Sequence, residues 1–225
     1  NSLAASGTGS RAVVTHEGGA LSIVTNATGG VFLNGYAPGG SCVYNFSGGE
    51  IDSRTKIFYI GFSGTGTINQ TGGRLLAASM NFSKSSAPTG GGTYNLTGGE
   101  LWLGGIAQKY AGAAAFNIGG ACLYPIAPGF NISDNTNPRL TGTNGLTRFC
   151  STGSTFTNTV SGLKGAGGFV KEGADTLNIA GAAHSFTGPV IVSNGTVNVS
   201  AAMSGGNAVL VAGGSMNLGT GVTAT

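Results

Sequence analysis

Charge is scarce in this sequence: charged residues make up 8% of its 225 positions, whereas a globular domain usually carries about a quarter. Its Lys and Arg residues never form a run of three, so the net charge of +3 predicts no nucleic-acid partner. No apolar run approaches the roughly 20 residues that span a bilayer, which predicts no membrane span. No basic and then apolar leader begins at Asn1, so we expect any secretion signal to have been removed or to lie outside this sequence.

Long stretches without glycine are also missing, because 44 of the residues are Gly. Each Gly inside a helix costs roughly 1 kcal/mol relative to Ala, and no window shows uninterrupted helical spacing of apolar residues. With 40% hydrophobic residues the chain is too apolar for a disordered linker. Short runs of Val, Ile, Thr, Phe and Tyr between the glycines instead predict an all-β protein with many tight turns.

A repeat organises the first half of the chain. Asn45, Asn69, Asn95 and Asn117 are 24, 26 and 22 residues apart, and each opens an Asn-centred segment that leads through a small or Gly-Gly corner. The four aligned segments are 44–51, 68–75, 94–101 and 116–123. Their period-2 pattern predicts strand, turn and strand, with one face buried only when neighbouring segments stack.

A period near 24 residues predicts one coil of a right-handed parallel β-helix, or β-solenoid, with about eight or nine coils. The Leu-x-x-Leu-x-Leu frame of leucine-rich repeats is absent, and propeller blades need longer repeats. Gln70 falls on an inward position of its segment, so we expect it to have a buried polar partner.

The C-terminal third has a different texture, which divides the chain into coils with Asn-centred repeats (1–160) and a continuation of the same solenoid (161–225). It contains GAGGFVKEG at 165–173, TLNIAG at 176–181, FTG at 186–188 and GTV at 195–197. This order resembles the autotransporter-associated β-strand repeat of bacterial passenger domains, with Phe186, Val197 and Asp175 as mild departures. The resemblance implies an extracellular β-helix on a bacterial surface and supplies no catalytic site.

Candidate catalytic groups are few. Glu50 and Glu100 occupy the same position two coils apart with Arg74 between them, and a surface salt ladder explains all three better than a polysaccharide-cleaving site does. His16 and His184 have no Ser or Cys beside them in the sequence. We therefore predict that the protein is not an enzyme and needs no cofactor.

Cysteine is rare as well, with Cys42, Cys122 and Cys150 as the three copies. Their spacing and the lack of a nearby His predict no metal site. Cys122 and Cys150 lie 28 residues apart, close to one coil, so a disulfide between neighbouring coils is predicted there. Three buried free thiols are the alternative.

Outward aromatic residues are candidate contacts for surface carbohydrate or for a neighbouring subunit. Alternation with Leu101 and Leu103 points Trp102 outward, and a loop folded over it is the equal alternative. Tyr36 and Tyr110 are loop aromatics of the same kind.

The Asn residues of the repeat are expected to share one outer face. We predict that Asn45, Asn69, Asn95 and Asn131 stack over one another. An Asn ladder is favoured there over a row of glycans, although Asn-x-Ser/Thr acceptor sequences are present.

Neither end of the repeat shows a polar cap. Strands follow directly from Val13 and Val14, and Val209 and Val211 are still solenoid-like, so both edges are open to pairing. Either the chain is a fragment of a longer solenoid or other copies complete its ends. We expect an extracellular structural solenoid that joins head to tail with copies of itself into a surface fibre. An adhesin or carbohydrate-binding passenger domain is the alternative.

Overall fold

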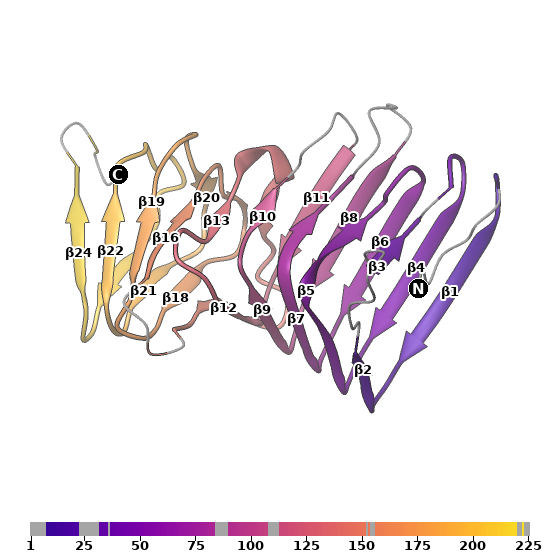
Figure 1. Ribbon diagram of the computed structural model, residues 1–225. Helices are drawn as coiled ribbons and strands as arrows, with labels where there is room; N and C mark the ends of the chain where they lie inside the picture. The colour runs from indigo at the N-terminus through magenta and orange to yellow at the C-terminus, as the bar shows by residue number, and fades with distance from the viewer. Residues whose placement is uncertain are drawn as a thin grey trace.

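The computed structural model describes residues 8–22, 32–35, 37–83, 90–107, 113–151, 153, 156–219 and 222. Its strands wind into a β-solenoid in which successive coils stack side by side (Figure 1). The strand pairs that it describes are parallel. Among the described residues the helical content is one 3-10 turn, η1 (Asp134–Thr136). The predicted all-β parallel solenoid is confirmed.

One side of the solenoid is a stack of eight strands, which we call sheet A. In stacking order these strands are β1 (Arg11–His16), β4 (Ser41–Phe46), β6 (Thr65–Gln70), β8 (Gly91–Leu96), β11 (Ala113–Ile118), β14 (Pro138–Leu140), β17 (Lys164–Gly165) and β20 (Ser185–Phe186). Consecutive members come from consecutive coils, so each coil contributes one strand to this side.

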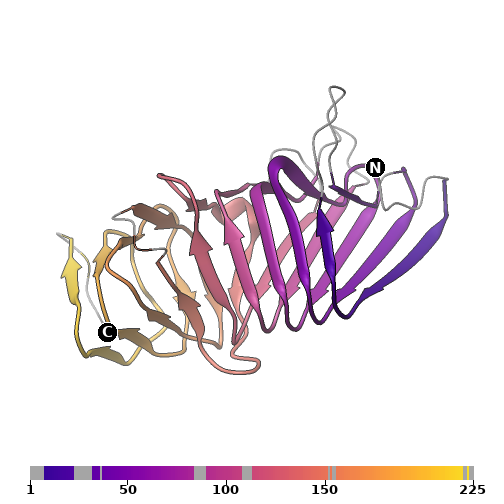
Figure 2. The same cartoon turned by 60° about the horizontal axis from the view of Figure 1, so that its bottom comes forward.

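The other strands form two further stacks, which two long strands join round a corner. The first stack, face B, holds β2 (Ala20–Ser22), β5 (Glu50–Ile60), β7 (Arg74–Asn81), β9 (Glu100–Leu103), β12 (Cys122–Pro125), β15 (Thr147–Phe149), β18 (Phe169–Lys171), β21 (Val190–Val192) and β23 (Val209–Val211). The second stack, face C, holds β3 (Phe32–Asn34), β10 (Ile106–Ala107), β13 (Asn131–Ile132), β16 (Thr157–Val160), β19 (Thr176–Ile179), β22 (Thr196–Val199) and β24 (Ser215–Leu218). Strands β5 and β7 run through both faces, pairing with β2 and β9 on face B and with β3 and β10 on face C. The turned view shows the coils as a continuous series (Figure 2).

The solenoid has about seven turns rather than the predicted eight or nine. The prediction divided the chain by a period of 24, but the first coil takes 30 residues, from Arg11 to its register partner Ser41. The last coil, in turn, touches sheet A only through an isolated bridge between His184 and Met203. Insertions in some coils and an incomplete last coil therefore lower the count.

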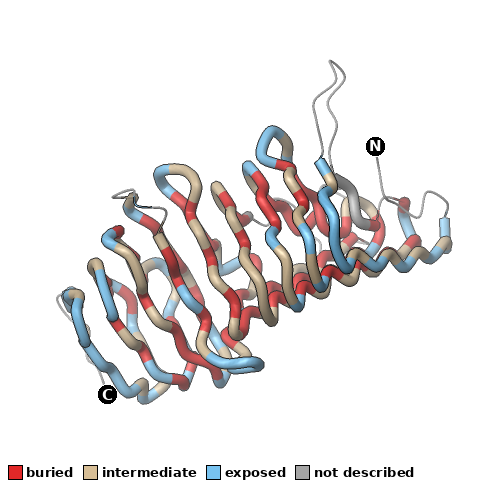
Figure 3. The backbone as a smooth tube through the Cα atoms, turned by 90° about the horizontal axis from the view of Figure 1, so that it is seen from below, coloured by how far each residue is buried: buried red, intermediate tan, exposed pale blue. Residues whose placement is uncertain are grey.

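The core is a column of apolar side chains from all three sides. On face B, Ile51, Leu75, Leu101 and Leu123 are in register and are at most 1% exposed. Buried and exposed positions alternate along each strand, as period-2 geometry requires (Figure 3). The return of the repeat to the buried side after each corner is therefore confirmed.

Gln70 has the buried partners that its inward position required. Its side-chain nitrogen donates to the carbonyl oxygens of Gly73 at 3.2 Å and Glu100 at 3.1 Å. Its side-chain oxygen accepts a hydrogen bond from the hydroxyl of Tyr94, a residue that is fully buried in the next coil. Because Tyr94 is enclosed, burial raises the pKa of its phenol. The polar group is thus satisfied inside the column.

An Asn ladder runs along the outer surface of sheet A. Asn69, Asn95 and Asn117 each donate a side-chain hydrogen bond to the Asn of the preceding coil, at 2.9, 2.8 and 2.8 Å, beginning with Asn45. The prediction that Asn131 belongs to this ladder is wrong.

Asn131 lies on β13 of face C, where its register partner is Thr159. The register partner of Asn117 in the next coil is Arg139. The Phe-Asn-Ile motif around Asn131 resembles the repeat locally, but stacking register decides which side a strand joins. A second ladder on face C, Asn178–Asn198–Asn217, has hydrogen bonds of 3.0 and 2.9 Å.

The strands of 161–225 continue the ladders of the first part. Strand β18 pairs with β15, and β19 pairs with β16, both in parallel. Inside these coils Lys171 and Asp175 form an ion pair at 2.5 Å, although their side chains are only 1% and 3% exposed. The Lys171 ammonium also donates to the carbonyl oxygens of Glu172 and Gly173, at 2.8 Å each. The Lys-x-Gly element therefore holds the turn that leads from face B to face C from the inside.

Candidate functional site

The C-terminal end of the solenoid exposes side chains that belong to the core. In β23 and β24, Val209, Val211 and Leu218 are 41%, 47% and 50% exposed. Their register partners one coil earlier, Val190, Val192 and Val199, are at most 1% exposed. The difference arises because no described residue stacks on the last coil. Figure 3 shows this coil almost wholly in the exposed colour.

The N-terminal end is open in the same sense. Strand β1 is the first strand of sheet A, and its other edge pairs with no strand among the described residues. Val14 faces the column and is half-buried, and His16 beside it contacts the hydroxyl of Tyr44 at 3.0 Å. Val13 faces outward and is 71% exposed. Of the four predicted edge residues, Val14, Val209 and Val211 therefore project toward the column, whereas Val13 contributes only its backbone to the edge.

The two ends match in architecture. The first coil presents unpaired edges of β1 on sheet A and β2 on face B, and the last presents β23 on face B and β24 on face C. All stacking is parallel, so the two ends have opposite, complementary edges. Such an edge is a template for a further strand.

The outward row of face B carries a second candidate site around Trp102. Leu101 and Leu103 are buried, and Trp102 projects outward between them, as predicted. Its ring stacks on Tyr124 of the next coil with centroids 4.3 Å apart and planes inclined by 17°. The indole nitrogen donates to the Glu100 carboxylate at 2.8 Å. The ring is held in a fixed orientation, and part of it stays accessible.

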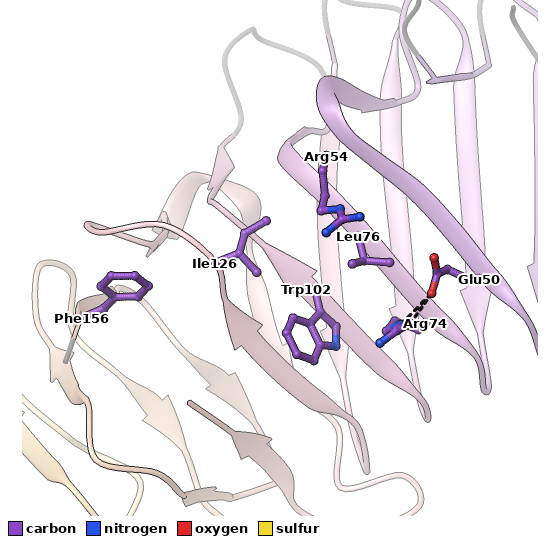
Figure 4. A pocket seen from close by; sticks show the side chains of 7 residues that line it. All are labelled: Glu50, Arg54, Arg74, Leu76, Trp102, Ile126 and Phe156. Carbon is purple, nitrogen blue, oxygen red and sulfur yellow. Dashed lines mark hydrogen bonds and ion pairs between the residues drawn. The ribbon is translucent and has the colours of Figure 1, made fainter. Parts of the chain in front are cut away.

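A groove of about 470 Å³ runs beside this ring on the outer surface (Figure 4). Its lining combines three charged side chains with four apolar or aromatic ones. The lining residues are Glu50, Arg54, Arg74, Leu76, Trp102, Ile126 and Phe156. In the close view Trp102 lies between Ile126 on one side and Arg74 and Leu76 on the other. The volume lies within the range of about 300–1,000 Å³ typical of ligand sites.

The charges of this surface are paired. Arg74 bonds the Glu50 carboxylate, with its Nε at 2.9 Å, and its guanidinium carbon lies 5.9 Å from the Trp102 centroid. Asp52 pairs with Arg54 at 2.6 Å, and the hydrogen bond from this guanidinium lowers the pKa of Asp52. The predicted ladder is therefore realised between Glu50 and Arg74, whereas Glu100 accepts its hydrogen bond from Trp102 instead.

Sequence reasoning missed most of the groove. Tyr124 could have been found, because in the aligned repeat it occupies the position that Trp102 occupies one coil earlier. Ile126 and Phe156 lie outside the repeated segments, so no periodic signal pointed to them. The other two predicted contact aromatics, Tyr36 and Tyr110, lie outside the described residues.

The predicted disulfide is not present in the structure, where Cys122 and Cys150 are free thiols. They are neighbours, but the register partner of Cys122 is Arg148, so Cys150 is its diagonal neighbour. Diagonal positions on adjacent strands lie about 7–8 Å apart, beyond the usual Cα separation of a disulfide. Burial and the adjacent Cys122 raise the pKa of Cys150 to about 12.

We expect all three cysteines to remain thiols in aerated buffer near neutral pH. A thiol with a pKa of about 12 is almost entirely protonated there, and the thiolate is the form that exchanges with disulfides. Unfolding the protein in acid and titrating it with a chromogenic disulfide reagent should give three thiols per chain. A value near one would show that the two coils had moved to form the bond.

The histidines do not assemble a catalytic or metal site. His16 lies at the N-terminal end, and His184 is buried near the C-terminal end, where it accepts a hydrogen bond from the Leu163 amide at 3.1 Å. Burial lowers the pKa of His184. The described residues contain no group of three or more His, Cys, Asp or Glu side chains arranged to hold a metal ion. They also contain no helix with the length and apolar character needed to cross a bilayer.

The fold and surface together define a parallel β-solenoid with open ends and one mixed polar and aromatic groove. Comparison with known proteins adds no closer class, since no protein-family profile, curated sequence or solved structure matches this chain. The similarity to the autotransporter-associated repeat therefore depends on the residues that carry it.

Proposed function

We propose that this protein is a structural β-solenoid whose copies stack head to tail. The observation that carries the proposal is the exposure of Val209, Val211 and Leu218, which are core positions in every other respect. A second copy placed on this end would bury them as the next coil buries Val190 and Val192. Completing that burial contributes on the order of 1 kcal/mol for each side chain.

Hydrogen bonding and charge favour the same contact. Each parallel ladder inside the chain joins one coil to the next, and an incoming first coil would extend these ladders with its free β1 and β2 edges. Between Val209 and Leu218 the last coil carries no charged residue, so little desolvation of charge opposes the contact. A heterologous contact that does not close produces a filament.

An extracellular location on a bacterial surface is part of this proposal. It is supported by the autotransporter-like pattern at 165–197 and by the low charge of the chain. Secretion with detection of the protein in the medium or on the cell surface would test it separately from assembly.

Assembly is tested by placing charge on the open end. We expect the parent protein to form rods or large species in sedimentation velocity and negative-stain microscopy, and Val209→Glu with Val211→Glu to leave monomers. The matched control is Ile57→Glu, because Ile57 is also 36% exposed but lies in the middle of the stack. Monomeric parent protein at high concentration, or equal assembly of the charged variant, would contradict the proposal.

A further inference from the structure

From the groove on face B we infer a binding site for an uncharged polysaccharide chain. The inference is independent of end-to-end stacking, because the groove lies on the side of the solenoid. A sugar ring combines apolar C–H faces with hydroxyl groups around its edge. A matching site needs apolar or aromatic surface beside hydrogen-bonding groups, and this groove supplies both.

The apolar part of the site is preorganised. Trp102 is fixed by its stack on Tyr124 and by the hydrogen bond to Glu100. Leu76, which is only 5% exposed, and Ile126 continue the apolar lining on its two sides. A ring already held in one rotamer loses little entropy when a ligand packs against it.

The polar part can donate and accept without carrying excess positive charge. Near the ring lie three carboxylates (Glu50, Asp52 and Glu100) and two guanidinium groups (Arg54 and Arg74), which gives a local net charge of −1. Both guanidinium groups already pair with carboxylates. An acidic polysaccharide or a nucleic acid would meet net repulsion, whereas ligand hydroxyls can hydrogen-bond to the free lone pairs and N–H groups of these pairs.

The shape of the groove favours a chain over a single sugar. The lining residues come from β5, β7, β9 and the end of β12, which are successive neighbours in face B. Three strand spacings of about 4.8 Å span roughly 14 Å along the solenoid axis. Phe156, which precedes β16, extends the lining further. The site is open along this length, so the ends of a polymer can leave it in both directions.

Arg74 is placed to respond to a ligand. Its guanidinium carbon is 5.9 Å from the Trp102 centroid, at the outer limit of a cation–π contact, and its side chain is 46% exposed. A sugar packed against the indole can displace it at small cost. The displaced guanidinium keeps its bond to Glu50 and can donate a second one to the ligand.

The test is affinity electrophoresis through native gels that contain one soluble polysaccharide each. The uncharged probes are β-glucan, xylan, galactomannan and dextran, and the acidic comparators are polygalacturonate and alginate. We expect at least one uncharged probe to retard the protein, and Trp102→Ala to weaken that binding by tenfold or more. Ile126→Glu adds a carboxylate while leaving the Trp102–Tyr124 stack in place, and it should weaken binding as well.

Ile191→Ala is the matched control, because Ile191 faces outward on β21 of the same face but lies outside the groove. Circular dichroism establishes that each variant is folded. Three results would overturn the inference: no retardation by any uncharged probe, retardation by the acidic probes alone, or equal binding by Trp102→Ala, Ile126→Glu and the parent. The side-by-side use of a truncating and a charge-adding variant keeps the test decisive if Trp102→Ala does not fold.

Discussion

Replacing Lys171 by Met is expected to lower the free energy of unfolding by about 3–5 kcal/mol. The substitution removes the ammonium that pairs with Asp175 at 2.5 Å and leaves that carboxylate almost completely buried without its counter-charge. It also removes the donor to the carbonyl oxygens of Glu172 and Gly173. Asn158, which donates to the other carboxylate oxygen at 2.5 Å, cannot replace a positive charge. Denaturant unfolding followed by circular dichroism measures the change.

Lys164→Met is the matched control for this substitution. Lys164 is exposed and donates to Asn137 at 3.2 Å, so its loss should change stability by no more than about 0.5 kcal/mol. Adding Asp175→Leu to Lys171→Met should recover part of the lost stability, because the uncompensated charge is then gone. Equal effects of the two Lys→Met variants would mean that the buried ion pair does not support the fold.

The second large effect is expected at the glycine corners, where Gly49→Ala should destabilise the protein by about 2–4 kcal/mol. Gly49 has a φ of 84°, in the left-handed region, and a Cβ there would overlap the carbonyl oxygen of Gly19 in the preceding coil. The left-handed conformation costs a residue with a Cβ roughly 1–2 kcal/mol. Overlap in a tightly packed region adds about 1–3 kcal/mol.

The first coil provides controls that separate these two causes. Gly19 has the same left-handed backbone, with a φ of 80°, but a Cβ there meets nothing within 4 Å. Gly48 lacks a left-handed φ, but its Cβ would overlap the Glu17 carbonyl oxygen, whereas a Cβ on Gly18 meets nothing within 4 Å.

We therefore expect Gly18→Ala to be nearly neutral, Gly19→Ala and Gly48→Ala to be intermediate, and Gly49→Ala to be the most destabilising. Unfolding should be measured at dilutions where the protein is monomeric, so that end contacts do not add to stability. If Gly48→Ala were as neutral as Gly18→Ala, backbone contact between stacked corners would not be the reason for the paired glycines.

Local periodicity was sufficient to predict the architecture. The recurrence of Asn45, Asn69 and Asn95 with Gly corners predicted parallel coils in register, and the hydrogen bonds between these side chains confirm it. Alternation also predicted the inward position of Gln70 and the outward position of Trp102. These succeeded because one stripe of a stacked strand must be apolar, so the facing of each residue is already visible in its neighbours.

The same alternation contained a signal that was not used. In Phe169-Val170-Lys171 the period of two that buries Phe169 also places Lys171 inside, where it is 1% exposed. Asp175, however, reaches Lys171 only because the turn between β18 and β19 brings it back. A buried charge is therefore foreseeable from the pattern, whereas its partner depends on the path of the turn.

The sequence by itself determined the parallel solenoid, the facing of its strands and the absence of a helical core, because these follow from repeat length, glycine corners and a period of two. Only the tertiary structure decided which side Asn131 joins, how many coils the chain completes and that Cys122 and Cys150 are diagonal neighbours. It also decided that Trp102, Ile126 and Phe156 line one groove. These features depend on loop lengths and on register between coils, and a shift of one or two residues in either alters the contacts while leaving the local pattern unchanged.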